Sequence, residues 1–407
     1  MNAVPLASLM RSAPLPEHSP TYPLTRPNAP KLSAYVDELA DIEASSWLSN
    51  YGPVNTRFET RIRDTLFAGR GSVLTVCNAT IGLMLALKLA AERRPGATYV
   101  VMPSFTFAAA AHAVLWAGLV PLLVDVDPSR WSADPEAEQR LLAQHGSAIA
   151  AVMPYATFGT CIDLAHYDRL AERFGVPVVV DAAASLGSLD GRGLQFGAGS
   201  PHTIIFSMHA TKAFALGEAG LITSADADVV ATLRRMGNFG FGTDRAALMP
   251  GLNSKISEVA ALAGLVKLSD FEAQIAHRAA LAETYLAELP DWTPQRLTGS
   301  RIAYQFMPFL LPEHLAPGRA QLRADLDRAR IGTGQYFVPP IHAQPYFHSR
   351  CQAESLPNTD AICARMMSLP MSDFMTTDDV ATICQTIRKL VAKVPAVRGD
   401  TRSFLVA

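Results

Sequence analysis

The sequence is poor in charge, and the charge it has is nearly balanced. Charged residues make up 18% of the 407 positions, and the formal net charge is −2. A surface that wraps nucleic acid or adheres to anionic lipid needs a basic excess, so the sequence argues against both kinds of partner. The expected partners are small molecules and a second copy of the chain.

Cysteine is scarce, and its spacing argues against a cysteine-bound metal site and against a disulfide-stabilised fold. The five cysteines are far apart, show no zinc or thioredoxin spacing, and are odd in number: Cys77, Cys161, Cys351, Cys363 and Cys384. We therefore expect no metal site and no disulfide framework, and this usage fits a reducing, cytoplasmic location.

No apolar run is long enough to cross a bilayer. The most lipid-like stretch, 74–91, is interrupted by Asn78, Thr80 and Lys88, and a buried helix explains it better. The N-terminal segment contains prolines and lacks a sustained apolar core, so it does not resemble a signal peptide. We expect no membrane span.

Between about Ser72 and Thr223, short β-rich apolar runs alternate with helical stretches. This alternation indicates parallel strands joined by crossover helices, hence an α/β fold. The expected strands are 73–76, 99–102, 120–124, 148–153, 176–180, 203–207 and 220–223. The expected helices between them are 79–91, 108–117 and 164–174.

After about Asn253 the pattern becomes helical and then mixed, which predicts a second, smaller α+β domain. A helix expected at 256–271 ends the first domain, and a second at 273–289 carries the chain out of it. The further expected helices are 319–330, 359–367 and 377–390, and the expected strands are 303–311 and 334–338. We predict an N-terminal arm (1–32), a large domain (33–270), a small C-terminal domain (271–393) and a tail (394–407).

Three polar features directly follow predicted strands: the turn CNAT at 77–80, Asp181, and the loop SMHATK at 207–212. Ligands of parallel sheets bind at the carboxyl ends of the strands. The sequence therefore predicts a ligand site at this edge.

Lys212 is one of seven lysines and lies in FSMHATKAFALGEAG, a segment of small and mostly uncharged residues. A desolvated lysine has a lowered pKa and can attack a carbonyl, which is how pyridoxal phosphate is captured as a Schiff base. The alternative is a loop lysine that extends to solvent beside Glu218.

Asp181 ends the run VPVVVD and precedes three alanines, so its carboxylate is carried to the tip of a strand. A carboxylate there can keep a pyridine nitrogen protonated, which allows the ring to accept electrons from a substrate carbanion. The alternative is an aspartate that caps a following helix.

The segment CNATIG turns a strand into a helix, and free amides at a helix N-terminus attract phosphate. Asn78 and Thr80 could add side-chain bonds, or could be ordinary capping residues. Ser207 could contact the same anion and Phe107 could cover the cofactor ring, although either could also be plain packing.

Taken together, these segments resemble the DegT/DnrJ/EryC1/StrS family of sugar aminotransferases, which has the pyridoxal-phosphate transferase fold type I. The resemblance covers nearly the whole chain. It runs through WLSNYGPVNTRFE, CNATIGLMLAL, MPSFTF, VVVDAAASLGS, FSMHATKAFALGEAG, GLNSKISEVAALAG, IGTGQYFVPPIHAQPYF and SLPM. Such an ordered set of matches is far more specific than any one of them. It implies a large domain with a mostly parallel mixed sheet flanked by helices.

The resemblance also implies a role for individual residues. Lys212 matches the Schiff-base lysine and Asp181 the partner of the pyridine nitrogen. The remaining implied positions are phosphate contacts at Ala79, Thr80, Ile81 and Ser207, ring stacking at Phe107, a phosphate contact from the other subunit at Asn253, and substrate contacts at Tyr336 and His342. A homodimer with shared active sites is therefore implied.

Three positions depart from the family pattern: Ala184 stands where a glutamine or histidine is usual, Ala219 replaces a glycine, and Lys255 replaces an arginine. These departures affect the tuning of the cofactor and the match to any particular sugar.

The function implied is transfer of an amino group from an amino acid, glutamate or glutamine, to a keto-sugar carried by a nucleotide, in amino-sugar or secondary-metabolite biosynthesis. The alternatives are a cyclitol aminotransferase, a sugar dehydratase of the same fold, and a regulatory protein that binds the cofactor or a sugar without catalysis. Dehydratases of this kind carry histidine at the position of Lys212, so the lysine favours amino transfer.

Overall fold

The computed structural model describes residues 20–392. The predicted N-terminal arm falls partly on residues 1–19, and the predicted tail wholly on 393–407, so both lie largely outside the described residues. All five cysteines are within the described part, and each is a free thiol. No helix among the described residues has the length and apolar character needed to traverse a membrane.

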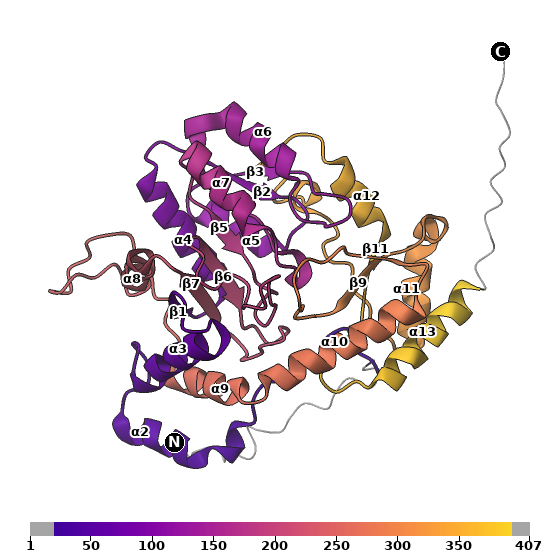
Figure 1. The fold of residues 1–407 in the computed structure, drawn as a ribbon, viewed down its shortest axis with the longest axis horizontal. Helices are drawn as coiled ribbons and strands as arrows, with labels where there is room; N and C mark the ends of the chain where they lie inside the picture. Colours follow the sequence, from indigo (N-terminus) through magenta and orange to yellow (C-terminus); the bar gives the residue numbers. More distant parts are fainter. Residues whose placement is uncertain (1–19, 393–407) are drawn as a thin grey trace, which may run out of the picture.

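The first part of the chain forms a mixed β-sheet flanked by helices (Figure 1). Its strands are β1 (Ser72–Val76), β2 (Tyr99–Pro103), β3 (Val120–Val124), β4 (Ile149–Val152), β5 (Val179–Asp181), β6 (Thr203–Ser207) and β7 (Gly220–Ser224). Its helices are α2 (Val36–Ser45), α3 (Pro53–Leu66), α4 (Ala79–Arg93), α5 (Ala108–Trp116), α6 (Pro135–His145), α7 (Leu164–Phe174), α8 (Ala227–Met236) and α9 (Glu258–Leu268).

The strand order is β1-β7-β6-β5, and bridges between Val152 and Val178 and between Tyr155 and Asp181 continue it into β4-β2-β3. Strand β7 runs antiparallel to both of its neighbours, whereas the other pairs are parallel. The predicted α/β class with a mostly parallel mixed sheet is therefore confirmed.

Each face of the sheet is covered by its own set of helices. Helices α4, α5 and α8 bury residues such as Leu83, Val114 and Leu233 against one face. Helices α3, α6, α7 and α9 pack on the other, with Ile62 and Leu170 in the same apolar cluster. Strands buried on both sides are near-continuous apolar runs, which is why these strands were predictable from sequence.

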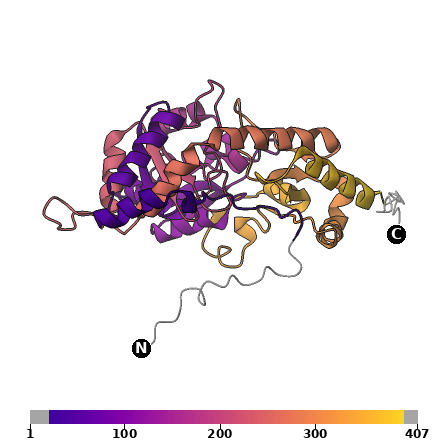
Figure 2. The same ribbon diagram turned by 90° about the horizontal axis from the view of Figure 1, so that it is seen from below.

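The second part of the chain packs beside the sheet as a smaller helical and antiparallel unit. Its elements are α10 (Phe271–Glu288), β8 (Thr293–Pro294), β9 (Met307–Leu310), α11 (Arg319–Arg328), β10 (Gln352–Ala353), α12 (Pro357–Arg365), β11 (Met366–Leu369) and α13 (Thr377–Val391). The sheet order is β11-β9-β8, while β10 returns to pair with β3. Helices α10 and α13 lie side by side in both views (Figures 1 and 2).

Two predictions for this second part were wrong. The stretch 334–338 is not a strand: Gly334 forms a single bridge to Ser368, while the next two rings, Tyr336 and Phe337, pack into an aromatic cluster. The helix predicted for 359–367 ends at Arg365, because the next residues form β11 and pair with β9. In both places tertiary pairing overrides local pattern.

An aromatic cluster joins the two parts at the carboxyl edge of the large sheet. It contains Phe105, Tyr155 and Phe158 from the large part, and Phe306 and Phe337 from the small one. The division at residue 270 remains a prediction.

Candidate functional site

The register of the sheet gathers the predicted features at one edge. Val76, the last residue of β1, pairs with Gly220, which in turn pairs with Ser207 at the end of β6. Asp181 ends β5 and pairs with Ile205 on the same strand β6. The turn after β1, the serine and the aspartate are therefore neighbours, because β1 and β6 are both antiparallel to β7 and so point the same way, and β5 is parallel to β6.

Asp181 is buried and is held by the backbone around it. It is 5% exposed, and its Oδ1 accepts a hydrogen bond from the Ala183 amide at 3.1 Å. Residues 182–185 form turns, so no helix begins there and the helix-cap alternative is wrong. Burial raises the pKa of Asp181 to about 6, although the Ala183 amide and the charge of Lys212 oppose that rise.

Lys212 follows β6 in the loop that leads to β7. Loss of hydration lowers the pKa of its amine to about 8, and the negative charge of Asp181 opposes the fall. The two side chains are therefore close enough for their charges to interact. With a pKa of about 8, about one tenth of the amine is neutral at pH 7. An amine of this kind can act as a nucleophile.

Two residues that sequence reasoning missed complete this centre. Gln305 accepts a hydrogen bond from Lys212 Nζ at 2.9 Å, and Tyr155 bridges to Asp181 from the neighbouring strand segment. Burial, followed by the Asp181 charge, raises the pKa of Tyr155. The one available signal for Gln305 was a lone amide inside the otherwise apolar and aromatic run AYQFMPF.

The N-terminus of α4 lies directly beside β7. The Asn78 side chain caps the helix by accepting from the Ile81 amide at 2.9 Å, so the capping alternative for Asn78 is confirmed and the Ile81 amide is engaged. The amides of Ala79 and Thr80 precede it in the first turn. A Cβ added to Gly220 would lie 2.8 Å from the Ala79 nitrogen, so only glycine allows this close packing.

Ser207 and Phe107 flank this helix end differently. Ser207 is 7% exposed, and its hydroxyl oxygen accepts from the His209 amide at 3.2 Å, which leaves its own proton available to donate. Phe107 precedes α5 and is 56% exposed, although its ring lies 6.3 Å from that of Phe337. An exposed ring at this sheet edge can pack on a planar ligand.

Asn253 is not brought to this centre within the chain. It forms a bridge to Asn238, its own side chain accepts from the Lys255 amide at 3.4 Å, and it is exposed. The segment between α8 and α9 extends away from the body of the molecule in both views (Figures 1 and 2). A contact with a second subunit thus remains a prediction.

The two predicted substrate residues, Tyr336 and His342, differ in the contacts that their side chains already make. Tyr336 stacks on Phe306, with ring centroids 4.9 Å apart and planes at 12°. His342 has both ring nitrogens engaged, Nδ1 with Ser104 Oγ at 2.8 Å and Nε2 with Asp360 Oδ1 at 3.1 Å. In this structure His342 is therefore a loop hydrogen-bonding residue.

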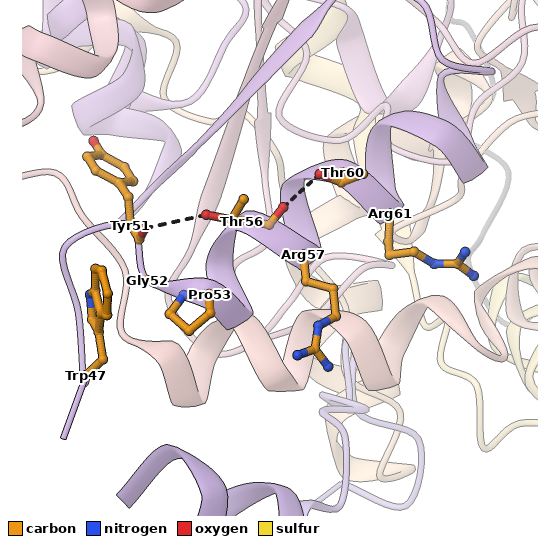
Figure 3. Close-up of a pocket in the computed structure, with 8 residues that line it drawn as sticks. All are labelled: Trp47, Tyr51, Gly52, Pro53, Thr56, Arg57, Thr60 and Arg61. Carbon is orange, nitrogen blue, oxygen red and sulfur yellow. Dashed lines mark hydrogen bonds between the residues drawn. The ribbon is translucent and has the colours of Figure 1, made fainter. Parts of the chain in front are cut away.

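A surface cavity of about 560 Å³ lies elsewhere, at the start of α3 (Figure 3). Its lining comprises Trp47, Tyr51, Gly52, Pro53, Thr56, Arg57, Thr60 and Arg61. None of these is a predicted cofactor or substrate residue, and the candidate site is the sheet edge around Lys212.

The residues present fit pyridoxal phosphate. A nucleophilic amine, a buried carboxyl group, the first-turn amides of a helix and an exposed aromatic ring meet the needs of its aldehyde, ring nitrogen, phosphate and ring face, respectively. The fold and this site define a pyridoxal-phosphate-dependent aminotransferase. The chain belongs to the DegT/DnrJ/EryC1/StrS aminotransferase family, whose model matches residues 33–388.

Three known proteins illustrate the similarity. A putative PLP-dependent aminotransferase from Bacillus cereus ATCC 10987 has 37% sequence identity and a TM-score of 0.85, over 90% of this chain and 99% of that one. DesI, solved in the presence of its TDP-sugar product, has 31% identity and a TM-score of 0.81, over 92% and 94%. The dTDP-4-amino-4,6-dideoxy-D-glucose transaminase of Escherichia coli is 27% identical, over 90% of this chain and 98% of its own length.

Proposed function

We propose that this aminotransferase moves an amino group from glutamate or glutamine to a keto-sugar linked to a nucleotide. The observation that carries the proposal is the pair formed by Lys212, whose pKa is lowered to about 8, and Asp181, at one edge of the sheet. The sugar and nucleotide are suggested by two relatives: DesI was solved in the presence of its TDP-sugar product, and the E. coli transaminase is named for a dTDP-linked amino sugar.

The roles of the chain's residues follow from their positions. Lys212 Nζ would hold the cofactor through its carbonyl carbon, whose oxygen leaves as water, and as a free amine it would move the proton at the substrate carbon. Asp181 would keep the proton on the ring nitrogen. When bound, the cofactor supplies an electron-accepting ring that stabilises negative charge on the substrate carbon.

The phosphate and the ring face would be held by other residues. The Ala79 and Thr80 amides and the Ser207 hydroxyl would bind the phosphate, with the positive end of the α4 dipole adding to the attraction. Phe107 would cover the ring, and Asn253 would reach the phosphate of the second subunit in a homodimer. Tyr336 would line the sugar pocket, with His342 fixing its outer loop.

A substrate panel tests this function. The purified protein is mixed with pyridoxal phosphate and with either glutamate or glutamine. TDP-linked keto-sugars and a keto-inositol are then added one at a time, and the products are identified by mass spectrometry. Conversion of a nucleotide-linked ketone to an amine supports the proposal, and the Lys212→Ala variant abolishes it. The control Lys88→Ala, which removes a half-exposed amine paired with Glu92, retains it.

Three other outcomes contradict the proposal. Amination of the keto-inositol alone would make the protein a cyclitol aminotransferase. Loss of water without gain of an amine would make it a dehydratase. A protein that remains colourless with the cofactor, and turns over nothing, would be a binding protein of another kind.

A further inference from the structure

Gln305 connects the small part of the chain to the catalytic loop. Its Oε1 accepts from Lys212 Nζ at 2.9 Å, and its Nε2 donates to Thr211 Oγ1 at 3.3 Å. Thr211 Oγ1 also bonds to His209 Nδ1 at 2.9 Å. The oxygen and the nitrogen of the Gln305 amide thus bond to two consecutive residues of the loop. Together these bonds fix the direction in which the amide oxygen points.

The backbone on either side of Gln305 is itself fixed. The Tyr304 carbonyl accepts from Arg278 Nη1 at 2.7 Å, and the buried Arg278 is paired with Asp373 at 2.5 Å. The Phe306 ring is buried in the aromatic cluster and stacks on Tyr336. Gln305 therefore approaches Lys212 from a rigid support outside the large sheet.

We infer that Gln305 is a positioning residue for Lys212, which holds Nζ at the edge of the sheet and stabilises its protonated form. This inference rests on the proposed function and names how the catalytic amine of that same site is controlled. A fixed carbonyl oxygen accepts more strongly from an ammonium group than from a neutral amine, so the contact favours the proton on Nζ. The same side chain thus affects both the position and the protonation of the amine, in addition to the charge of Asp181.

The charged groups around the amine define what a substitution can change. Asp181 opposes the lowering of the Lys212 pKa from the end of β5, and Tyr155 forms a backbone bridge to Asp181. In the loop itself, His209 and Glu218 lie 3.4 Å from each other and form their own pair. Gln305 is the neutral acceptor in this set, so replacing it leaves these charges in place.

Two substitutions of Gln305 by residues of similar size should shift the pKa of the Lys212 amine in opposite directions. Gln305→Leu removes the acceptor, and the pKa of Lys212 should fall by about one unit, a tenfold rise in the neutral amine below the midpoint. Gln305→Glu places a negative charge there, and the pKa should rise by about one unit. If Gln305 had a purely structural role, the pKa shift would not have opposite signs in the two variants.

The experiment follows uptake of pyridoxal phosphate by the full-length protein. The rate is measured from visible absorbance on both sides of pH 8, near the wild-type midpoint. The pH dependence of Lys212 acetylation, by mass spectrometry of the labelled peptide, provides a second readout without cofactor. The matched control is Gln295→Leu, since Gln295 is buried and its amide bonds to the Arg130 and Thr157 carbonyls instead.

Opposite shifts in the two Gln305 variants, with the control at the wild-type midpoint, support the inference. Equal midpoints, or shifts of the same sign, overturn it. If neither variant folds, Thr211→Val decides, because it removes the acceptor of Nε2: a smaller downward shift supports the inference, and no shift overturns it. Wild-type protein that takes up no cofactor overturns the proposed function itself.

Discussion

The substitution Asp181→Asn separates two effects that the same carboxylate has on the site. Asparagine has nearly the same size, and its oxygen can still accept from the Ala183 amide that bonds to Asp181 Oδ1 at 3.1 Å. What it loses is the negative charge. Because the side chain is 5% exposed, little water is available to replace that charge.

The charge of Asp181 partly offsets the desolvation that lowers the pKa of Lys212 to about 8. At an effective dielectric constant of about 20, two unit charges interact by roughly 4 kcal/mol at about 4 Å and by less at greater separation, so the loss of one charge of a facing pair changes the energy by on the order of 2 kcal/mol. Each pKa unit corresponds to about 1.4 kcal/mol, so the pKa of Lys212 should fall by about one unit or slightly more. At pH 7 the neutral fraction of the amine should rise from about one tenth to about one half, roughly fivefold, and cofactor uptake should accelerate.

Amino transfer should change in the opposite direction. A neutral amide cannot hold a proton on the ring nitrogen, and loss of a positioned acid or base typically costs at least about 100-fold in rate. The assay therefore measures cofactor uptake and keto-sugar amination in the same preparations. Faster uptake together with slower turnover is the expected signature.

The control is Asp163→Asn, because Asp163 caps α7 by accepting from the Ala165 amide, a role that asparagine fills equally well. Both rates should stay at the wild-type value in that variant. An Asp181→Asn protein with an unchanged uptake midpoint would refute the electrostatic coupling of Asp181 and Lys212. Unchanged turnover would refute the role at the ring nitrogen.

Further predictions concern the amine, the helix cap and the close packing of β7. In wild-type protein, cofactor uptake should rise with pH and reach half its maximum near pH 8, because only the neutral amine of Lys212 attacks; a flat profile from a spectrophotometric titration would contradict this. Asn78→Ala should cost about 1 kcal/mol of unfolding free energy in urea, through loss of the cap bond to the Ile81 amide; an unchanged midpoint would argue against that cap. Gly220→Ala should cost roughly 1–3 kcal/mol, because its Cβ would lie 2.8 Å from the Ala79 nitrogen. Gly191→Ala, with open space around the added carbon, is the matched control, and equal urea midpoints for the two variants would contradict the packing argument.

The strands of the large sheet could be predicted because each is an apolar run buried on both faces. Strands β3 and β6, at 120–124 and 203–207, have the predicted bounds. Lys212 and Asp181 were also visible in the sequence, since a lysine in an uncharged segment and an aspartate at a strand tip are local signals. Their shared edge follows from parallel topology alone.

The small part of the chain was less predictable because long-range pairing decides its form. The apolar stretch 334–338 has the composition of a strand, yet its aromatic rings fill the space between the two parts of the chain. Similarly, 366–369 continues the helical pattern of α12 but pairs with β9 instead. In both segments the choice between a local pattern and long-range packing cannot be made from a short stretch of sequence.

The sequence by itself determined the strands of the large sheet, the polar residues at the strand tips, and the family. These depend on the spacing of apolar residues and on short motifs, which are local properties. The tertiary structure alone decided that Gln305, 93 positions from Lys212 along the chain, accepts from its amine, and that His342 is engaged by Ser104 and Asp360. Contacts between residues so distant in sequence arise when separate cores pack together, and no local pattern encodes them.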